Sequence, residues 1–288
     1  MPLGLKTVSL SGGEPCAHPD LAAIVASLNE IGIQVSLYTC GVLEDYSRRP
    51  RSLVPGLVAS LHQAGLERAI FNYQSARSEI HDKITMVKGS HLAATQSIET
   101  CINKGIKTEL HIVPLKQNLF TLPLTIEYAK SLGLSRVSLL RFVPQGRGAY
   151  DVSSKLLDQD EYGHLREIIK AANGFMRLGS PFNFLKTRGY VPCTAAIDKL
   201  IIRANGDVFA CEAFKQTSLT LGNIFKRNIA EIWCSRTTSD FRSALNAHSL
   251  QLSPACEIDN CFGQFTVMNQ LAGKMADANT CQQQAFGI

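Results

Sequence analysis

Hydrophobic positions follow two alternating spacings through the first half of the chain. In some stretches apolar residues recur every three or four positions, as on one helical face; the first has Leu21, Ile24, Val25, Leu28 and Ile31. Such stretches end at Gly32, Gly65, Gly105 and Gly133. After each glycine comes a short apolar run, at 34–38, 68–72, 107–113 and 136–142, and residues 7–10 form one more. The pattern predicts five strands alternating with helices, the order of a parallel α/β sheet.

Polar residues at the edges of these segments indicate where elements begin and end. Ser90 is expected to cap the helix that runs to Gly105. Further helices are expected over 118–132 and 162–172, the second within a polar bridge at 151–184. Beyond the bridge, the apolar runs 199–202 and 208–211 flank Asn205-Gly206-Asp207, a typical hairpin turn. The pattern of residues in the C-terminal third therefore predicts a β-hairpin followed by a helix.

Composition narrows the class of protein. At 288 residues with 45% hydrophobic content, the chain can bury a large core. Its apolar runs are far too short to span a bilayer, and its start lacks the pattern of a secretion signal, so we expect a cytoplasmic protein without membrane contact. The cysteine count of nine is odd, which in the cytoplasm favours free, metal-binding or catalytic thiols over disulfides.

Charge gives little sign of a nucleic-acid partner. The formal net charge of +5 is modest, and the lysines and arginines are scattered. The one basic cluster, Arg48-Arg49-Pro50-Arg51, is better explained as a solvated loop than as a nucleic-acid-binding segment. We therefore expect no nucleic acid among the partners.

Candidate chemistry first occurs where the first predicted strand ends, at Gly12-Gly13-Glu14-Pro15. Glycines permit positive φ and leave room for a bound molecule to approach the peptide groups. Loops at the carboxyl ends of parallel strands are where α/β folds place ligands. On these residues alone, a tight strand-to-helix turn and a ligand-binding loop are both open.

The run S-G-G-E-P-C-A-H-P-D-L, followed by a helix and then V-S-L-Y-T-C-G, resembles the radical S-adenosylmethionine (SAM) superfamily. The resemblance implies that Gly12, Gly13, Glu14 and Pro15 lie at the amino group of the SAM methionine moiety. It also implies a partial (β/α)6 TIM-like barrel over residues 1–150 that lacks the family's first strand. Cys40 stands where the family often has Asn in T-N-G.

In that fold the ends of three further strands would face the same pocket. The resemblance implies that Asn72 and Ser75, with the strand end at His111, contact the ribose and the SAM carboxylate, and that the loop from Val143 contacts adenine. Arg141 on an apolar strand end needs an anion partner, which a carboxylate would supply. Alternatives remain, because Asn72 and Ser75 would also suit a turn and His111 a hydrogen-bonded core position.

Four cysteines in the C-terminal third form two close-set pairs. Cys193 and Cys211 bracket the predicted hairpin, and Cys256 and Cys261 share a short loop. Two thiol pairs suit either a tetrahedral zinc site or a 4Fe-4S cluster, and spacing alone does not separate these.

The order C…G-D-V…C, L-G-N-I, E-I-W and a final cysteine pair resembles the SPASM or twitch module of radical SAM enzymes. The resemblance implies a small iron-sulfur module over 185–288, with Cys193, Cys211, Cys256 and Cys261 holding one auxiliary 4Fe-4S cluster. Cys281 is either an alternate ligand or a thiol on a tail.

The resemblance implies an oxidoreductase in which SAM yields a 5′-deoxyadenosyl radical that abstracts hydrogen, while the auxiliary cluster supports oxidation. A precursor peptide is the favoured substrate and flavodoxin or ferredoxin the expected electron donor; dehydrogenation of a small alcohol and a non-catalytic iron-sulfur protein are the alternatives. The sequence contains no C-x3-C-x2-C loop, which holds the SAM cluster in the family. We therefore expect an N-terminally truncated chain that forms no 5′-deoxyadenosine by itself.

Overall fold

The computed structural model describes residues 3–144, 146–185, 191–214, 219–251 and 261. It divides into two compact units, which are described separately. One comprises Gly4–Leu140 with Gly163–Arg177, and the other comprises Arg141–Tyr162 with the chain from Leu178 onward and Met1–Leu3. The predicted boundaries at 150 and 184 stay a prediction.

A six-stranded sheet organises the first unit, in the order β1-β2-β5-β6-β7-β8. Its strands are β1 (Thr7–Leu10), β2 (Gln34–Thr39), β5 (Arg68–Asn72), β6 (Lys107–Ile112), β7 (Val137–Leu139) and β8 (Met176–Leu178). The four pairs from β1 to β7 are all parallel. The predicted α/β class and its five strands are confirmed. The sixth strand, β8, lies in the stretch that was expected to be helical, where three residues are too few to produce a visible alternation.

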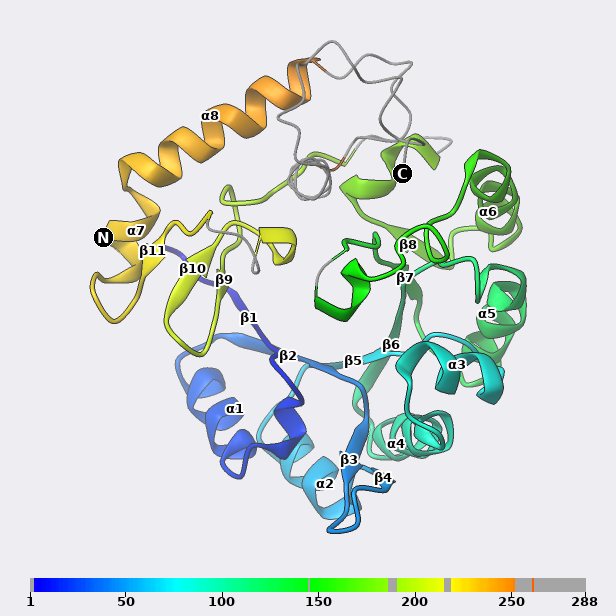
Figure 1. Ribbon diagram of the computed structural model, residues 1–288. Coiled ribbons are helices and arrows are strands. Elements are labelled where there is room, and N and C mark those ends of the chain that lie inside the picture. Colours follow the sequence, from blue (N-terminus) through cyan, green and yellow to red (C-terminus); the bar gives the residue numbers. More distant parts are fainter. Residues whose placement is uncertain (1–2, 145, 186–190, 215–218, 252–260, 262–288) are drawn as a thin grey trace. The chain divides into compact units, whose positions relative to one another are not determined.

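Helices cover the convex side of this curved sheet (Figure 1). They are α1 (Leu21–Glu30), α2 (Pro55–Gln63), α4 (Ser90–Asn103), α5 (Leu122–Ser131) and α6 (Gln159–Ala171). A shorter helix, α3 (Ser78–Thr85), follows β5, and one-turn 3-10 helices occupy Pro15–Ala17 and Leu119–Thr121. The sheet residues on the helix side are apolar and buried, among them Val35, Leu37, Phe71, Leu110 and Val137. Alternation along the strands puts the polar residues on the opposite side.

The prediction that Ser90 caps α4 is wrong. The carboxylate of Asp82, in the preceding helix α3, accepts from the N–H groups at the start of α4 instead. Ser90 lies inside the helix and Gly89 stands at the N-cap. One Asp82 oxygen accepts from the Gly89 N–H at 2.6 Å, and the other accepts from the His91 N–H at 2.8 Å and from the Ser90 hydroxyl at 3.1 Å. A carboxylate bonds more strongly than a hydroxyl to the unpaired N–H groups at a helix start.

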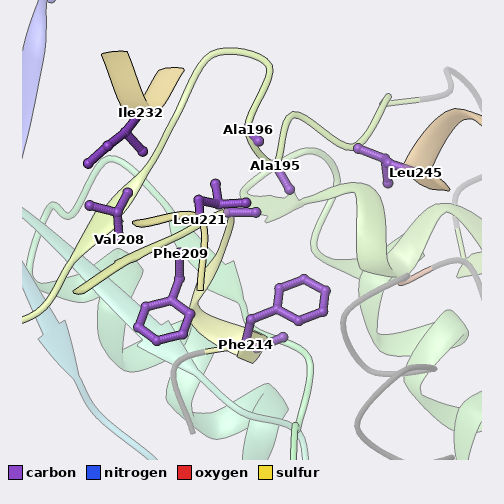
Figure 2. Close-up of a cluster of buried hydrophobic side chains, with 10 residues drawn as sticks. Ala195, Ala196, Val208, Phe209, Phe214, Leu221, Ile232 and Leu245 are labelled. Carbon is purple, nitrogen blue, oxygen red and sulfur yellow. The ribbon is translucent and has the colours of Figure 1, made fainter. Parts of the chain in front are cut away.

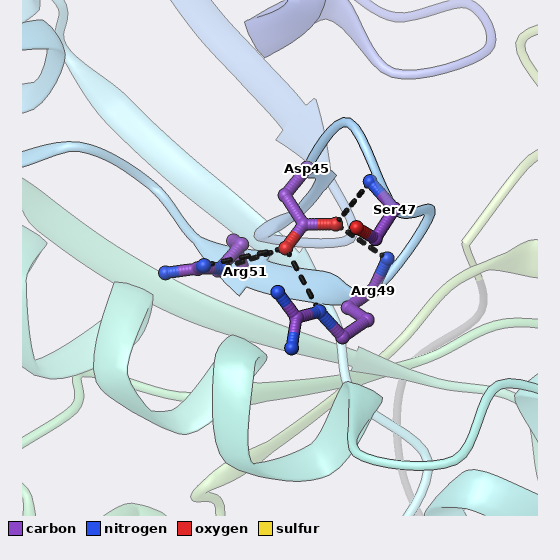
Figure 3. A network of polar contacts seen from close by, with 4 residues as sticks. All are labelled: Asp45, Ser47, Arg49 and Arg51. Carbon is purple, nitrogen blue, oxygen red and sulfur yellow. Dashed lines mark hydrogen bonds and ion pairs between the residues drawn. The ribbon is translucent and has the colours of Figure 1, made fainter.

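The basic cluster lies in a hairpin of β3 (Val42–Glu44) and β4 (Pro50–Ser52) rather than in a loop without strands, with Arg48 and Arg49 in the turn and Arg51 in β4. Asp45 organises it, accepting from the N–H groups of Ser47 and Arg49 and pairing with the guanidinium groups of Arg49 and Arg51 (Figure 3). These hydrogen bonds, that of the Arg49 N–H foremost, lower the pKa of Asp45 to about 2. The arginines are exposed, as the prediction of a solvated segment requires.

The second unit contains a small antiparallel sheet and two helices. Its strands are β9 (Ile201–Ile202), β10 (Asp207–Phe209) and β11 (Gly222–Asn223), and its helices are α7 (Ile229–Trp233) and α8 (Arg236–Gln251). Further 3-10 turns occupy Gly146–Ala149, Ser180–Leu185 and Glu212–Phe214. The predicted hairpin is confirmed. Gly206 has a φ of 83°, and a Cβ there would lie 2.6 Å from the Phe225 ring, so both conformation and space require glycine.

The core of the second unit is an apolar cluster that includes residues of β10 (Figure 2). Its buried members are Ala195, Ala196, Val208, Phe209, Ala210, Ala213, Phe214, Leu221, Ile232 and Leu245. Cys193, Cys211 and Val143 pack against the cluster. Two of the predicted metal ligands therefore border an apolar core. Across the described part of the chain, no helix is both long and apolar enough to cross a membrane.

Candidate functional site

The Gly-Gly-Glu-Pro loop is fixed by the side chain of Glu14. Its Oε1 accepts from the Cys16 N–H at 3.0 Å and from the Thr39 hydroxyl at 2.7 Å. Its Oε2 accepts from the Cys40 N–H at 2.9 Å and from the Cys40 thiol at 2.8 Å. The carboxylate thus joins the loop after β1 to the end of β2, and both of its oxygens are occupied by this chain.

What the loop offers a ligand is the backbone at Gly12 and Gly13. Gly12 has a φ of 145°, which L-residues rarely adopt, and a Cβ at either glycine would meet nothing within 4 Å. Peptide groups held open in this way can approach a bound molecule directly. The geometry therefore fits the methionine end of SAM, with the peptide groups of the glycines as the contacts and Glu14 as their support.

The two cysteines of this region are inert thiols. Burial, together with the neighbouring Glu14, raises the pKa of Cys40 to about 12, and the same causes raise that of Cys16 still further. Both remain protonated near neutral pH. Cys40 donates to Glu14 from its thiol as well as from its N–H. Cys40 thus supplies a side-chain donor at the position where the family often has Asn, whose amide is also a donor.

Two amide side chains lock the loop after β5 to the loop after β6. Gln74 contacts the Asn72 side chain and accepts from the Val113 N–H at 3.3 Å. Asn118, which is 1% exposed, donates to the carbonyl oxygens of Gln74 and Val113, each at 3.0 Å, and accepts from the Leu115 N–H. Sequence reasoning placed Asn118 at a helix start and missed this role. A buried amide is recognisable only once its partners are known.

Asn72 and Ser75 differ in accessibility. Asn72 is exposed at the end of β5. Ser75 is fully buried; its hydroxyl bonds to that of Thr121 at 2.9 Å and accepts from the Arg77 N–H at 3.0 Å. This geometry is that of a residue stabilising a turn, one of the alternatives that the sequence left open. A ribose contact by Ser75 stays a prediction.

His111 is buried on β6, with its ring edge-on to Tyr38 at 5.1 Å between centroids. Burial lowers its pKa to about 4. Its Nδ1 atom is buried without a hydrogen-bond partner in the described part of the chain. His111 therefore occupies a core position, as one of the alternatives predicted, but its Nδ1 lacks the hydrogen bond that was expected with that position within the described residues.

Arg141 and Val143 belong to the second unit. The Arg141 guanidinium lies over the rings of Tyr162, Phe182 and Phe184 at 5.5, 5.9 and 5.0 Å, and its Nη1 donates to the Pro181 carbonyl oxygen at 3.2 Å. These aromatic faces contribute to stabilising the Arg141 cation. Val143 is half-buried. Contacts of these residues with SAM stay a prediction.

Three of the four predicted cluster ligands are described, and they lie in one neighbourhood. Burial, with smaller contributions from the nearby Cys261 and Cys193, raises the pKa of Cys211 to about 12 against the opposing effect of the Ala213 N–H. The Ala213 N–H donates to the Cys211 sulfur at 3.3 Å. Thiols beside an apolar core with an N–H donor at sulfur suit an iron-sulfur cluster. Cys256 and Cys281 lie outside the described residues, and within those residues no three metal-binding side chains are gathered closely enough to hold an ion.

Family comparisons match the two regions of the chain that contain these residues. The profile of the radical SAM superfamily matches residues 2–134, and that of SPASM, an iron-sulfur cluster-binding domain, matches residues 193–262. The chain belongs to the radical SAM superfamily. The second match begins at Cys193 and ends one residue after Cys261. Two predictions are confirmed at the level of this family: its cofactors are SAM and 4Fe-4S clusters, and its members are enzymes.

Similar proteins include enzymes with different products. The chain is 26% identical to the AdoMet-dependent heme synthase of Methanosarcina barkeri over 80% of its length, and 25% identical to the PqqA peptide cyclase of Ruegeria pomeroyi, also over 80%. It covers 69% and 61% of those relatives. Its fold matches Streptococcus suis SuiB bound to S-adenosylmethionine, with a TM-score of 0.69 at 16% identity, covering 96% of this chain and 66% of SuiB. A second SuiB structure, bound to the precursor peptide SuiA, matches with a TM-score of 0.66.

Proposed function

We propose that this chain belongs to an oxidoreductase that modifies a precursor peptide by radical SAM chemistry. The observation that carries the proposal is the open, rigidly supported backbone at Gly12 and Gly13, within the matched radical SAM region. When bound, SAM and a reduced 4Fe-4S cluster supply a radical that abstracts hydrogen from an unactivated C–H bond.

The residues proposed to bind SAM are those on the strand ends: Gly12, Gly13, Glu14, Pro15, Asn72, Ser75, Arg141 and Val143. Gly12 and Gly13 act through their peptide groups, while Glu14 holds those groups in place through Thr39 and Cys40. Because Cys16 and Cys40 remain protonated and bonded to neighbours, they are not nucleophiles in this scheme.

Cys193, Cys211, Cys256 and Cys261 are proposed to hold the auxiliary cluster. The apolar surroundings of Cys193 and Cys211 exclude water, and the Ala213 N–H stabilises charge on the Cys211 sulfur. A cluster in this module would accept one electron from the substrate radical that hydrogen abstraction leaves, and with the loss of a proton this would complete the oxidation. Flavodoxin or ferredoxin is the proposed electron donor.

Two relatives support a peptide substrate. The cyclase of Ruegeria pomeroyi is named for a peptide, and SuiB has been seen with a precursor peptide. The heme synthase similarity supports a second candidate, a substrate that is not a peptide. The two candidates share the hydrogen-abstraction chemistry and differ only in what is oxidised.

The test is anaerobic turnover after cluster reconstitution, with dithionite, SAM and a candidate precursor peptide. It is run on this chain and on the chain joined to a C-x3-C-x2-C segment from a relative. The expected result with the joined chain is formation of 5′-deoxyadenosine together with a peptide that has lost a pair of hydrogen atoms. A scrambled peptide is the control. Formation of 5′-deoxyadenosine with every peptide unchanged would contradict peptide modification.

A further inference from the structure

A row of polar residues crosses the sheet on the side opposite the helices. The register pairs Asn72 of β5 with His111 of β6, and His111 with Ser138 of β7. Paired residues of neighbouring parallel strands point to the same side of the sheet. Arg177 of β8 is near enough to influence the His111 ring electrostatically. All of these residues lie in the first compact unit.

Two residues of this row have buried polar atoms without a partner. His111 is 7% exposed and Ser138 is 5% exposed. Neither the His111 Nδ1 nor the Ser138 Oγ has a hydrogen-bond partner among the described residues. Leaving a buried polar atom unpaired costs free energy, so such groups are rare, and a bound group that pairs with them removes the cost. Two of them on directly paired residues indicate a group that is supplied from elsewhere.

The charges around the row favour an anion. One register step below, Glu109 is 2% exposed and pairs with Arg68 at 2.9 Å and with Arg136 at 2.8 Å. The buried Nε of Arg136 has no partner in the described part of the chain. Arg177 is exposed, and no ion pair is found for it among the same residues. Three arginines therefore face one glutamate on this side, which leaves an excess of positive charge.

We propose that His111, Ser138 and Arg177 form a binding subsite for a carboxylate group of the substrate. The Ser138 hydroxyl and the His111 ring, in the tautomer with its proton on Nδ1, donate to the carboxylate oxygens, and the Arg177 guanidinium neutralises the charge. Arg136 adds positive charge from the next register step. The Tyr38 ring forms one wall beside His111. Assigning the carboxylate to the substrate rests on the proposed function, whereas the subsite itself does not.

The test is binding, so it needs neither a cluster nor turnover. The probes are N-acetylglutamate N-methylamide and its glutamine isostere, which differ in charge but not in shape, titrated into the 288-residue chain by ligand-observed NMR. The glutamate probe should bind about tenfold more tightly or better. Ser138→Ala and Arg177→Gln should each remove most of this preference. Arg236→Gln, which removes an arginine that is 94% exposed on α8, should leave it intact.

A stability measurement separates a binding role from a structural one. Because the Ser138 hydroxyl has no hydrogen-bond partner among the residues that the structure describes, Ser138→Ala should leave the free energy of unfolding unchanged or raise it. Loss of stability in that variant, or equal binding of the two probes by the wild type, would overturn the subsite. Displacement of the glutamate probe by SAM, but not by decarboxylated SAM, would assign the carboxylate to the cofactor and overturn the substrate assignment. Simultaneous binding of SAM and probe supports it.

Discussion

The carboxylate of Glu14 and the hydroxyl of Thr39 meet at 2.7 Å, joining the loop after β1 to the last residue of β2. The adjacent Cys40 N–H binds the other carboxylate oxygen. This link makes the position of Gly12 and Gly13 depend on the neighbouring strand. A ligand that contacts their backbone therefore binds a loop that is already ordered, so binding does not include the entropy cost of ordering it.

Glu14→Gln should lower the stability of the first unit. The new amide nitrogen cannot accept from the Cys40 N–H and thiol, so at least one donor loses its partner. The expected loss is about 1–3 kcal/mol of unfolding free energy, measured by urea denaturation. Glu79→Gln is the matched control, because Glu79 is an exposed glutamate whose contacts are a 3.7 Å ion pair to Arg77 and a 3.3 Å hydrogen bond from the Ser78 hydroxyl, both at the surface. Equal stability of the two variants would contradict the role assigned to Glu14.

Substituting the two glycines separately should distinguish strain from obstruction. Gly12→Ala forces a side chain onto a residue with a φ of 145°, which should cost about 1–3 kcal/mol of folding stability. Gly13 has no positive φ and open space, so Gly13→Ala should fold normally. Its methyl group would nevertheless occupy space on the proposed ligand side. SAM binding, measured by equilibrium dialysis, should weaken in both variants, and unchanged binding in Gly13→Ala would contradict a direct contact there.

The sequence predicted the elements whose signals are local. Strands β1 and β5 occur at the residues expected, because an apolar run ending at a glycine or an asparagine carries its own boundaries. Strand β8 was missed since three residues show no period. The β3–β4 hairpin was missed because its turn depends on hydrogen bonds to Asp45 rather than on an Asn-Gly pair.

The site was predictable in its motifs but not in its contacts. Gly-Gly-Glu-Pro and the cysteine order identified the two regions, yet the partners of Glu14 come from residues 25 and 26 positions away. Likewise, the buried Asn118 bonds to Gln74 across 44 positions. Such pairs depend on the register between strands. That the His111 Nδ1 and the Ser138 Oγ have no hydrogen-bond partner within the described ranges is visible only in the three-dimensional structure.

Asp82→Asn should destabilise the start of α4. Asn retains one acceptor but loses the charge that favours the helix N-terminus, and its amide group faces N–H donors. The expected loss at neutral pH is about 1 kcal/mol, measured by denaturation. Burial alone raises the pKa of Asp82, but the hydrogen bonds from Gly89, His91 and Ser90 outweigh it and hold the pKa below its usual value.

This lowered pKa gives the direction of the pH effect at Asp82. Its contribution is complete above the unfolded-state pKa and is lost as the pH falls through the lower folded-state value. The difference between wild type and Asp82→Asn should therefore shrink below about pH 4. Ser90→Ala is the control for a hydroxyl cap and should cost less. If Ser90→Ala lost more unfolding free energy than Asp82→Asn, Ser90 rather than Asp82 would be the cap of α4.

The auxiliary site should hold about four iron and four sulfide after anaerobic reconstitution. Cys193→Ala, Cys211→Ala, Cys256→Ala and Cys261→Ala should each lower that content, because each removes a thiolate ligand. Cys234→Ala is the matched control, since Cys234 is exposed and has no place in the proposed set. Iron and sulfide are assayed chemically beside a zinc measurement. Finding one zinc per chain and no sulfide would show that these cysteines form a zinc site and not an iron-sulfur cluster.

Acidification below pH 6.5 should destabilise the first unit through His81. This residue is 1% exposed, and its Nδ1 accepts from the Gln74 N–H at 3.2 Å. Burial, with a smaller contribution from His91, lowers its pKa to about 4. An unfolded histidine has a pKa of about 6.5, so between these values the unfolded chain binds more protons than the folded one. Stability is therefore complete above pH 6.5 and is lost as the pH falls toward 4.

The expected loss from His81 is on the order of 3 kcal/mol over that range, or about 1.4 kcal/mol per pH unit once the proton is fully bound in the unfolded state. His111 has the same lowered pKa, so the wild type should approach a slope of two protons near pH 5. His81→Asn keeps an acceptor for the Gln74 N–H and removes one titrating group, which should reduce that slope by one proton. The slope of unfolding free energy against pH is measured by urea titrations at pH 5 to 7. An identical slope in wild type and His81→Asn would show that folding does not lower the pKa of His81.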